Sequence, residues 1–236
     1  MKFPTFCSLG DRLLIIEFGD SAHPLITERI ASLVNHWREN PVEGVLNVIP
    51  SVCGIGMFYE PEVWLDSKSS STPYDNLKRR VKEELELVPA ELRSDPKLME
   101  IPVVYGQEYG EDFNELSSAS GLKENEFIRL HSDHVYIVYM IGFAPGFPYL
   151  GPLNPRLNFP RRKTPRLKVP KGSVAIASQM TGIYPGEYPG GWNLIGRTPT
   201  VMFDFAEQKG SKLRIGDRVI FKPITKNEFL NIVDTS

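Results

Sequence analysis

Short apolar runs and segments with helical periodicity follow one another over the first hundred residues. Residues 12–18 form an apolar run typical of a strand, and residues 24–37 predict a helix because their apolar side chains recur about every 3.6 positions. Two further strands are expected at 45–49 and 55–59, separated by Pro, Ser and Gly. The chain therefore opens with the pattern strand, helix, strand, strand.

A second helix and a fourth strand complete this pattern. The helix begins at Thr72-Pro73, where Asp75 completes a start that resembles a capping box. If residues 98–105 supply the fourth strand, the order is βαββαβ, which is the ferredoxin-like arrangement of two split βαβ units. We therefore predict an α+β class with a ferredoxin-like domain over residues 1–100.

Residues 101–236 have a different pattern. Helical segments at 112–119 and 123–131 form a bridge, with Gly121 placed to end the first of them. An almost unbroken apolar run at 134–141 then predicts a strand. Shorter strand candidates, bounded by Gly, Pro and Asp, follow at 174–177, 194–195, 200–205 and 218–221. This all-β pattern fits either a closed barrel or a sandwich, and the second domain is expected over residues 101–236.

Composition narrows the class of protein. The 236 residues carry a net charge of -2, and 41% of them are hydrophobic, which is usual for a soluble globular protein and unusual for a nucleic-acid-binding one. The N-terminus lacks the apolar core of a signal peptide, so we expect a cytoplasmic location. Cys7 and Cys53 are expected to be reduced thiols. No metal-binding spacing, phosphate loop or serine-hydrolase elbow is present.

Residues 141–199 are rich in Pro and Gly, yet aromatic residues recur throughout them. This composition predicts ordered loops on a β scaffold, and such loops commonly carry binding or catalysis. Phe143, Phe147, Tyr184 and Trp192 could line an apolar groove, with Glu187 as an acid or base whose pKa the aromatic rings would raise. Alternatively, the aromatic rings plug the end of a barrel, and Glu187 is a solvated turn residue or pairs with an arginine.

Two other features suggest chemistry. The segment Arg161–Lys171 holds six cations and no acid, so it predicts a local positive potential that a phosphate or carboxylate could use, unless it is only an exposed basic loop. His131 ends a helical segment, where a structural role and a catalytic role both remain open.

Four ordered motifs carry a family resemblance. GFAPGFPYLG, TPRLKVPKGSVAIA, TGIYPGEYPGGW and NLIGRTP resemble the C-terminal half of the KipI family, which is also called the 5-oxoprolinase B-subunit (PxpB) family or allophanate hydrolase subunit 1. The chain is also similar to the carboxyltransferase domain, subdomains C and D, of urea carboxylase. The resemblance implies that the second domain is a cyclophilin-like β-barrel. Met180 and Tyr188 depart from the smaller or more polar residues expected at these positions, which could narrow the groove.

The resemblance also implies a function. The chain would be the B subunit of an ATP-dependent 5-oxoprolinase complex that opens 5-oxoproline to L-glutamate, together with a companion carboxyltransferase-like C subunit and a lactam-binding A subunit. ATP would serve the complex as cofactor, and no metal is expected. By residue type and motif position, the candidate site comprises the catalytic Glu187 and His131, the substrate- or phosphate-binding Arg166, Arg197, Gln179 and Tyr184, and the groove residues Phe143, Phe147 and Trp192.

Two alternatives share the same motifs. A KipI-type binding protein would use the aromatic groove to clasp and inhibit a sensor histidine kinase. A urea or allophanate carboxyltransferase-type subunit would move carboxylate from biotin to an amide, but this chain has no biotin-accepting Met-Lys motif.

Overall fold

A computed structural model describes residues 4–66, 68, 70–89, 96–204 and 210–234. By its internal contacts the chain divides into two compact units, Met1–Asp95 and Pro96–Ser236. Helices and strands occur in both units, which confirms the α+β class. Residue 100, where the sequence places the domain boundary, lies inside strand β5 (Leu98–Tyr105) of the second unit.

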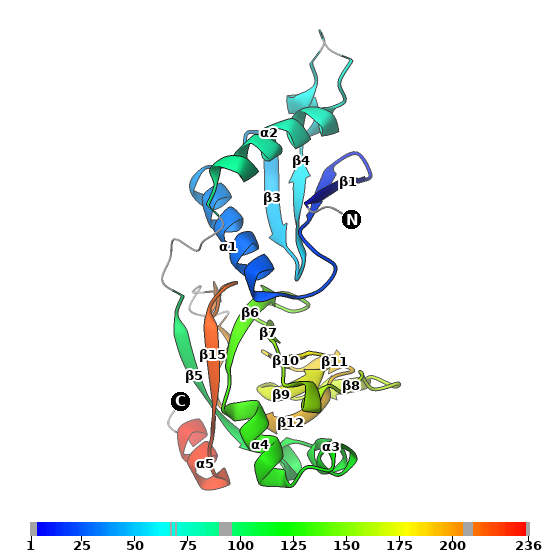
Figure 1. Cartoon of the computed structure of the whole chain (residues 1–236). Helices are drawn as coiled ribbons and strands as arrows, with labels where there is room; N and C mark the ends of the chain where they lie inside the picture. The colour runs from blue at the N-terminus through cyan, green and yellow to red at the C-terminus, as the bar shows by residue number, and fades with distance from the viewer. Residues whose placement is uncertain (1–3, 67, 69, 90–95, 205–209, 235–236) are drawn as a thin grey trace. The chain divides into compact units, whose positions relative to one another are not determined.

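The first unit is a four-stranded antiparallel sheet with two helices against one face (Figure 1). The strands lie in the order β1-β2-β4-β3. The elements are β1 (Thr5–Leu9), β2 (Leu13–Glu17), α1 (Pro24–Glu39), β3 (Val45–Pro50), β4 (Gly54–Tyr59), the 3-10 turn η1 (Pro61–Trp64) and α2 (Pro73–Leu87).

Local sequence signals explain both helices of this unit. Pro24 occupies the first turn of α1, and His23 caps it by accepting a hydrogen bond from the backbone of Leu25. At the start of α2, the Thr72 hydroxyl accepts from the Asp75 backbone at 3.1 Å, and Asp75 bonds back to Thr72, so the predicted capping box is confirmed. Each helix buries one apolar face against the sheet.

The predicted βαββαβ order of the first domain is wrong. The strand at 98–105 does not join this sheet, because it pairs with β15 (Arg218–Pro223) and β12 (Asn193–Arg197) of the second unit. The fourth strand is β1, which forms a hairpin with β2 and gives the order ββαββα. Its sequence TFCSL lacks a clear apolar alternation, and its last three residues are exposed.

The second unit is a closed barrel with the strand order β10-β7-β6-β15-β5-β12-β9, so the barrel interpretation is correct and the sandwich is excluded. Its first half contains β5, the turn η2 (Gln107–Tyr109), α3 (Phe113–Ser120), α4 (Glu124–Ser132), β6 (Val135–Ile141), β7 (Pro148–Gly151), the turn η3 (Pro155–Leu157) and β8 (Arg166–Val169). Its second half contains β9 (Ser173–Ala177), β10 (Met180–Ile183), β11 (Tyr188–Gly190), β12, β13 (Phe203–Asp204), β14 (Gly210–Ser211), β15 and α5 (Lys226–Asp234).

Several predicted elements of this unit are confirmed. Gly121 ends α3 with a φ of 66°, the left-handed conformation expected of a C-terminal glycine. The strands at 134–141, 174–177 and 218–221 correspond to β6, β9 and β15. The strand expected at 200–205 is shorter, since only Phe203–Asp204 is a strand and residue 205 lies outside the described residues.

The barrel encloses the main apolar core of this unit. Parallel pairing runs from Arg218 beside Leu98 to Pro223 beside Val103, so the first and last strands of the unit lie side by side (Figure 1). Its fully enclosed side chains include Ile101, Val103, Tyr136, Val138, Leu150, Val174, Ile176, Ile183, Ile195, Val219 and Phe221. In the part of the chain that the structure describes, no helix has the length and apolar character needed to span a bilayer.

Candidate functional site

An aromatic cluster forms where the loop after β6 meets the segment between β10 and β12. The ring of Phe147 packs edge-on against Trp192, with centroids 5.5 Å apart, and against Tyr184 at 5.1 Å. Phe147, Tyr184 and Trp192 are buried, with 2%, 1% and 5% of their surface exposed. These three residues therefore pack as a buried cluster and do not line an open groove.

Phe143 differs from the other rings of this cluster. It is 60% exposed, although its ring lies 5.4 Å from that of Phe147 and 6.1 Å from that of Tyr188. Its φ of 70° is a left-handed conformation that is costly for a bulky side chain. The loop thus holds one apolar ring at the surface above a buried aromatic cluster.

Glu187 lies on this surface and is not enclosed by the rings. Its side chain is 58% exposed and pairs with Lys168 at 3.1 Å. The alternative pairing of Glu187 with an arginine is not seen among the described residues, and the Nε of Arg197 donates to the backbone oxygen of Lys171 at 2.8 Å. Glu187 and Lys168 form an exposed ion pair, which contributes little to stability.

Arg166 is held by acidic residues that precede α3. Its Nη2 donates to Asp112 Oδ1 at 2.8 Å, and its Nε donates to Glu111 at 3.1 Å. Arg162 donates to the same Asp112 oxygen at 2.6 Å, and the second Asp112 oxygen accepts from the backbone of Leu194 at 2.7 Å. Burial lowers the pKa of Arg166, but the two carboxylates outweigh this effect and raise the pKa above its usual value.

Asp112 is thus a central residue that the sequence analysis missed. It is 4% exposed, and it connects the basic loop to β12. The adjacent acids Glu111 and Asp112, directly before a helix and some fifty residues from the arginines, were the available signal. Periodicity alone cannot show that they meet Arg162 and Arg166.

His131 lies inside the barrel core and away from solvent. It is fully buried and stacks on Phe221 at 4.5 Å. Its Nδ1 hydrogen-bonds the Tyr105 hydroxyl at 2.8 Å, and its Nε2 hydrogen-bonds the Thr181 hydroxyl at 2.9 Å. Burial, with a smaller effect of the nearby His134, lowers the pKa of His131 to about 3. The ring is neutral and both nitrogens are engaged, which fits the structural role.

Gln179 lies apart from these groups, on the rim of a pocket of about 630 Å³. Met180 and Tyr188 are partly buried and pack against the aromatic cluster.

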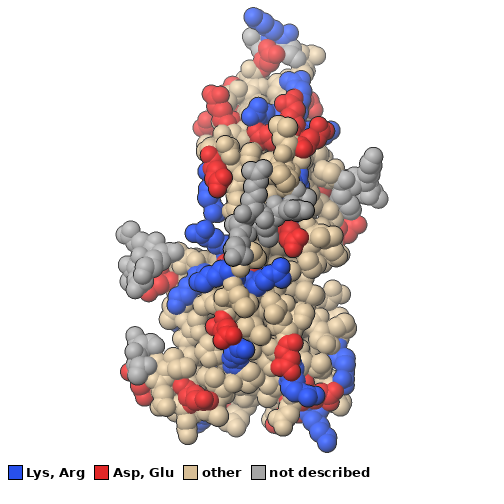
Figure 2. Space-filling model, turned by 60° about the vertical axis from the view of Figure 1, so that its left-hand side comes forward, with Lys and Arg blue, Asp and Glu red and all other residues tan. Residues whose placement is uncertain are grey.

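Among the described residues, no group of three or more His, Cys, Asp or Glu side chains could hold a metal ion. Positive and negative side chains are both scattered over the face shown in Figure 2.

Comparisons with known proteins agree with the motifs. Residues 4–213 match the family model of the carboxyltransferase domain, subdomain C and D. The 5-oxoprolinase B subunit of Bacillus subtilis (strain 168) is 37% identical over 223 residues, which cover 94% of this chain and 93% of that protein. The 5-oxoprolinase B subunit of Escherichia coli O157:H7 is 48% identical over 132 residues, which cover 56% of this chain and 61% of that protein.

Solved structures share the fold. The crystal structure of TTHA0988 is 33% identical with a TM-score of 0.77, and the match covers 91% of this chain but 40% of that longer chain. The Kluyveromyces lactis urea carboxylase matches with a TM-score of 0.73 over 98% of this chain and 22% of its own; at 20% identity it shows the fold alone. By the family model and the nearly full-length B-subunit relative, the chain belongs to the carboxyltransferase-domain family of subdomains C and D, among the 5-oxoprolinase B subunits.

Proposed function

We propose that this chain is the B subunit of an ATP-dependent 5-oxoprolinase complex that opens 5-oxoproline to L-glutamate. The observation that carries the proposal is the 37% identity to a 5-oxoprolinase B subunit over 94% of this chain and 93% of that protein. In the proposal, the complex also contains a companion carboxyltransferase-like C subunit and a lactam-binding A subunit, and it works in the cytoplasm.

The reaction requires an activated lactam. Phosphorylation of the lactam carbonyl oxygen by ATP makes the ring labile to water, and the site then needs cations for the phosphate and an acid or base for the tetrahedral intermediate. Glu187 is the proposed acid or base, because its carboxylate is 58% exposed and a lactam presented by another subunit can reach it. Arg197 is a proposed phosphate contact, since only its Nε is hydrogen-bonded to another described residue.

The remaining candidate residues have supporting roles in this proposal. Arg166 holds the basic loop through Asp112 and Glu111, so we assign it positioning and not direct phosphate binding. His131 is buried in the barrel core and hydrogen-bonds Thr181, so its role there is to stabilise the barrel. Tyr184 is buried and packs within the aromatic cluster. We also propose that the two compact units are the two domains, and that the closed barrel is of the cyclophilin-like type.

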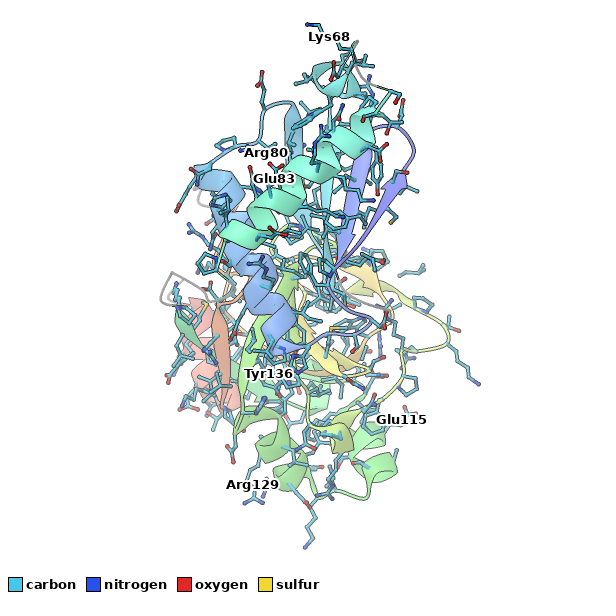
Figure 3. All side chains as sticks on the ribbon, turned by 45° about the horizontal axis from the view of Figure 1, so that its top comes forward. Lys68, Arg80, Glu83, Glu115, Arg129 and Tyr136 are labelled. Atoms are coloured by element: carbon cyan, nitrogen blue, oxygen red, sulfur yellow. The ribbon has the colours of Figure 1, made fainter. Side chains whose placement is uncertain are left out.

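The test is ATP-dependent formation of glutamate from 5-oxoproline by this chain alone, with its companion C subunit, and with both other subunits. Activity in the full set and none in the isolated chain would support the proposal. Glu187→Gln should then lower the rate, whereas Glu115→Gln, at an exposed glutamate on α3 (Figure 3), should not. If the three subunits assemble but form no glutamate, the proposal that this chain is the B subunit is wrong.

A further inference from the structure

The pocket that contains Gln179 lies entirely within the barrel unit. It opens where the end of α4, the loop after β7 and the turn between β9 and β10 meet, and its volume is about 630 Å³. Leu130, Leu153 and two prolines supply apolar surface, while the polar lining includes Arg129, His134, Asn158 and Gln179. A concave apolar surface with a few polar groups is the usual character of a small-molecule site.

Backbone contacts fix the walls of this pocket. The backbone N–H of Leu153 donates to the Gln179 carbonyl at 2.9 Å, which ties the β9–β10 turn to the loop after β7. Ser178 holds a φ of 53° in that turn, and its N–H donates to the Phe159 carbonyl at 2.6 Å. At the end of α4, the Tyr136 hydroxyl donates to the His131 carbonyl at 2.9 Å. The polar side chains are therefore carried by anchored elements.

Four polar side chains of the pocket have no hydrogen-bond or ion-pair partner among the described residues. Arg129, His134, Asn158 and Gln179 form no side-chain hydrogen bond or ion pair with another described residue. Arg129 projects from α4 (Figure 3), and it contrasts with the neighbouring Arg156, which pairs with Glu126 at 2.6 Å.

We propose that this pocket binds a small carboxylic acid that also carries an amide group. The planar guanidinium of Arg129 can pair with a carboxylate through two hydrogen bonds. The amides of Asn158 and Gln179 each offer the donor and the acceptor that a ligand amide requires. Leu130 and Leu153 accommodate the methylenes between the two groups.

The one acid in the lining is Asp133, whose carboxylate accepts a weak hydrogen bond from Ser132 at 3.4 Å. Asp133 forms no ion pair with Arg129 in the part of the chain that the structure describes. Its carboxylate suits a ligand that carries an ammonium group beside its own carboxylate. Two ligand sources share the proposed chemistry: the lactam 5-oxoproline and a free amino acid such as L-glutamine. The proposal rests on the proposed function only for the choice of 5-oxoproline as a probe.

Isothermal titration of the full chain with these two compounds tests the site. We expect at least one of them to bind with a dissociation constant of about 1 mM. Two partial probes serve as controls: 2-pyrrolidinone lacks the carboxylate and L-proline lacks the amide, so each should bind at least about tenfold more weakly. Binding of 5-oxoproline alone would identify a lactam site, and binding of glutamine alone would identify an amino-acid site; either supports the proposal.

Variants locate the binding. Arg129→Met and Gln179→Leu should each weaken it at least about tenfold, and both positions are exposed, so the variants should fold. Arg38→Met, at an exposed arginine of α1, is the matched control and should bind normally. Absence of binding up to about 10 mM, equal binding of the partial probes, or undiminished binding by Arg129→Met would overturn the proposal. Because titration needs no partner protein, failure here is distinct from failure of the complex to make glutamate.

Discussion

Replacing Asp112 with alanine tests whether one buried carboxylate organises the basic loop. Asp112 is 4% exposed and accepts hydrogen bonds from Arg162 at 2.6 Å, Arg166 at 2.8 Å and the backbone of Leu194 at 2.7 Å. The alanine variant would leave all three donors without this acceptor. Arg166 would keep only its contact with Glu111, which is 55% exposed.

The cost can be worked from these contacts. Removing one partner of a buried ion pair costs about 3–5 kcal/mol, and an unpaired buried N–H such as that of Leu194 adds about 1–3 kcal/mol. Two facts reduce the total: Arg162 is 34% exposed and can recover water, and Arg166 keeps Glu111. We therefore expect a loss of about 3 kcal/mol, equivalent to a fall in Tm of about 10 °C for a unit of this size.

Urea unfolding followed by circular dichroism measures this loss. Glu111→Gln is the matched control, because it removes an exposed partner of the same Arg166 and should cost about 0.5 kcal/mol. A double-mutant cycle of Asp112→Ala with Arg166→Met should show a coupling energy above about 1 kcal/mol. A loss for Asp112→Ala no larger than that of Glu111→Gln would refute the reasoning.

Three further predictions follow from burial and charge. Phe147→Ala should lower the free energy of unfolding by about 3–5 kcal/mol, whereas Phe143→Gly should change it by less than about 1 kcal/mol because glycine suits a φ of 70°; urea unfolding distinguishes them, and equal losses would contradict the burial argument. Burial lowers the pKa of His131 to about 3, so between its ordinary value of 6.5 and about pH 3 the unfolded chain binds a proton that the folded chain excludes. Stability should therefore fall by up to about 1.4 kcal/mol per pH unit as the pH drops through this range, and an unchanged slope in His131→Gln would rule out His131 as its source. Arg161→Met should lower glutamate formation by the assembled complex more than Lys163→Met does, because Arg161 lies over the Trp192 ring at 6.0 Å and is held beside the aromatic cluster; equal rates would contradict a role for Arg161 in the reaction.

Local signals predicted helices α1 to α4 well, missed α5, and predicted the long-range strand pairing poorly. The capping box at Thr72 and the terminating Gly121 act within a few residues, so the sequence shows them directly. By contrast, β5 joins the barrel because it pairs with β15, a strand more than a hundred residues later. Nothing in the apolar pattern of 98–105 distinguishes an eight-residue barrel strand from the last strand of the preceding sheet.

The candidate site was predictable in its residue types and not in its pairings. The loop motifs correctly pointed to an ordered aromatic region, because aromatic residues among Pro and Gly need a packed environment. Gln179 and Glu187 stand eight positions apart in the sequence, yet Gln179 lines a pocket with α4 and Glu187 pairs with Lys168. The turn at Ser178, with its positive φ, directs the chain in a way that spacing alone does not predict.

In the folded chain, carboxylates pair with half of the six cations in the basic segment 161–171. Six cations without an acid predict a strong local field, but Asp112 and Glu111 pair with Arg162 and Arg166 after folding, and Glu187 pairs with Lys168. Since the paired arginines are the less exposed ones, their role is to anchor the loop against the barrel. Of the six cations in this segment, Arg161, Lys163 and Lys171 have no carboxylate partner among the described residues, and Arg161 lies over the Trp192 ring of the aromatic cluster. An anion that reaches this face would therefore meet Arg161 beside Trp192, while Arg166 keeps that face in place.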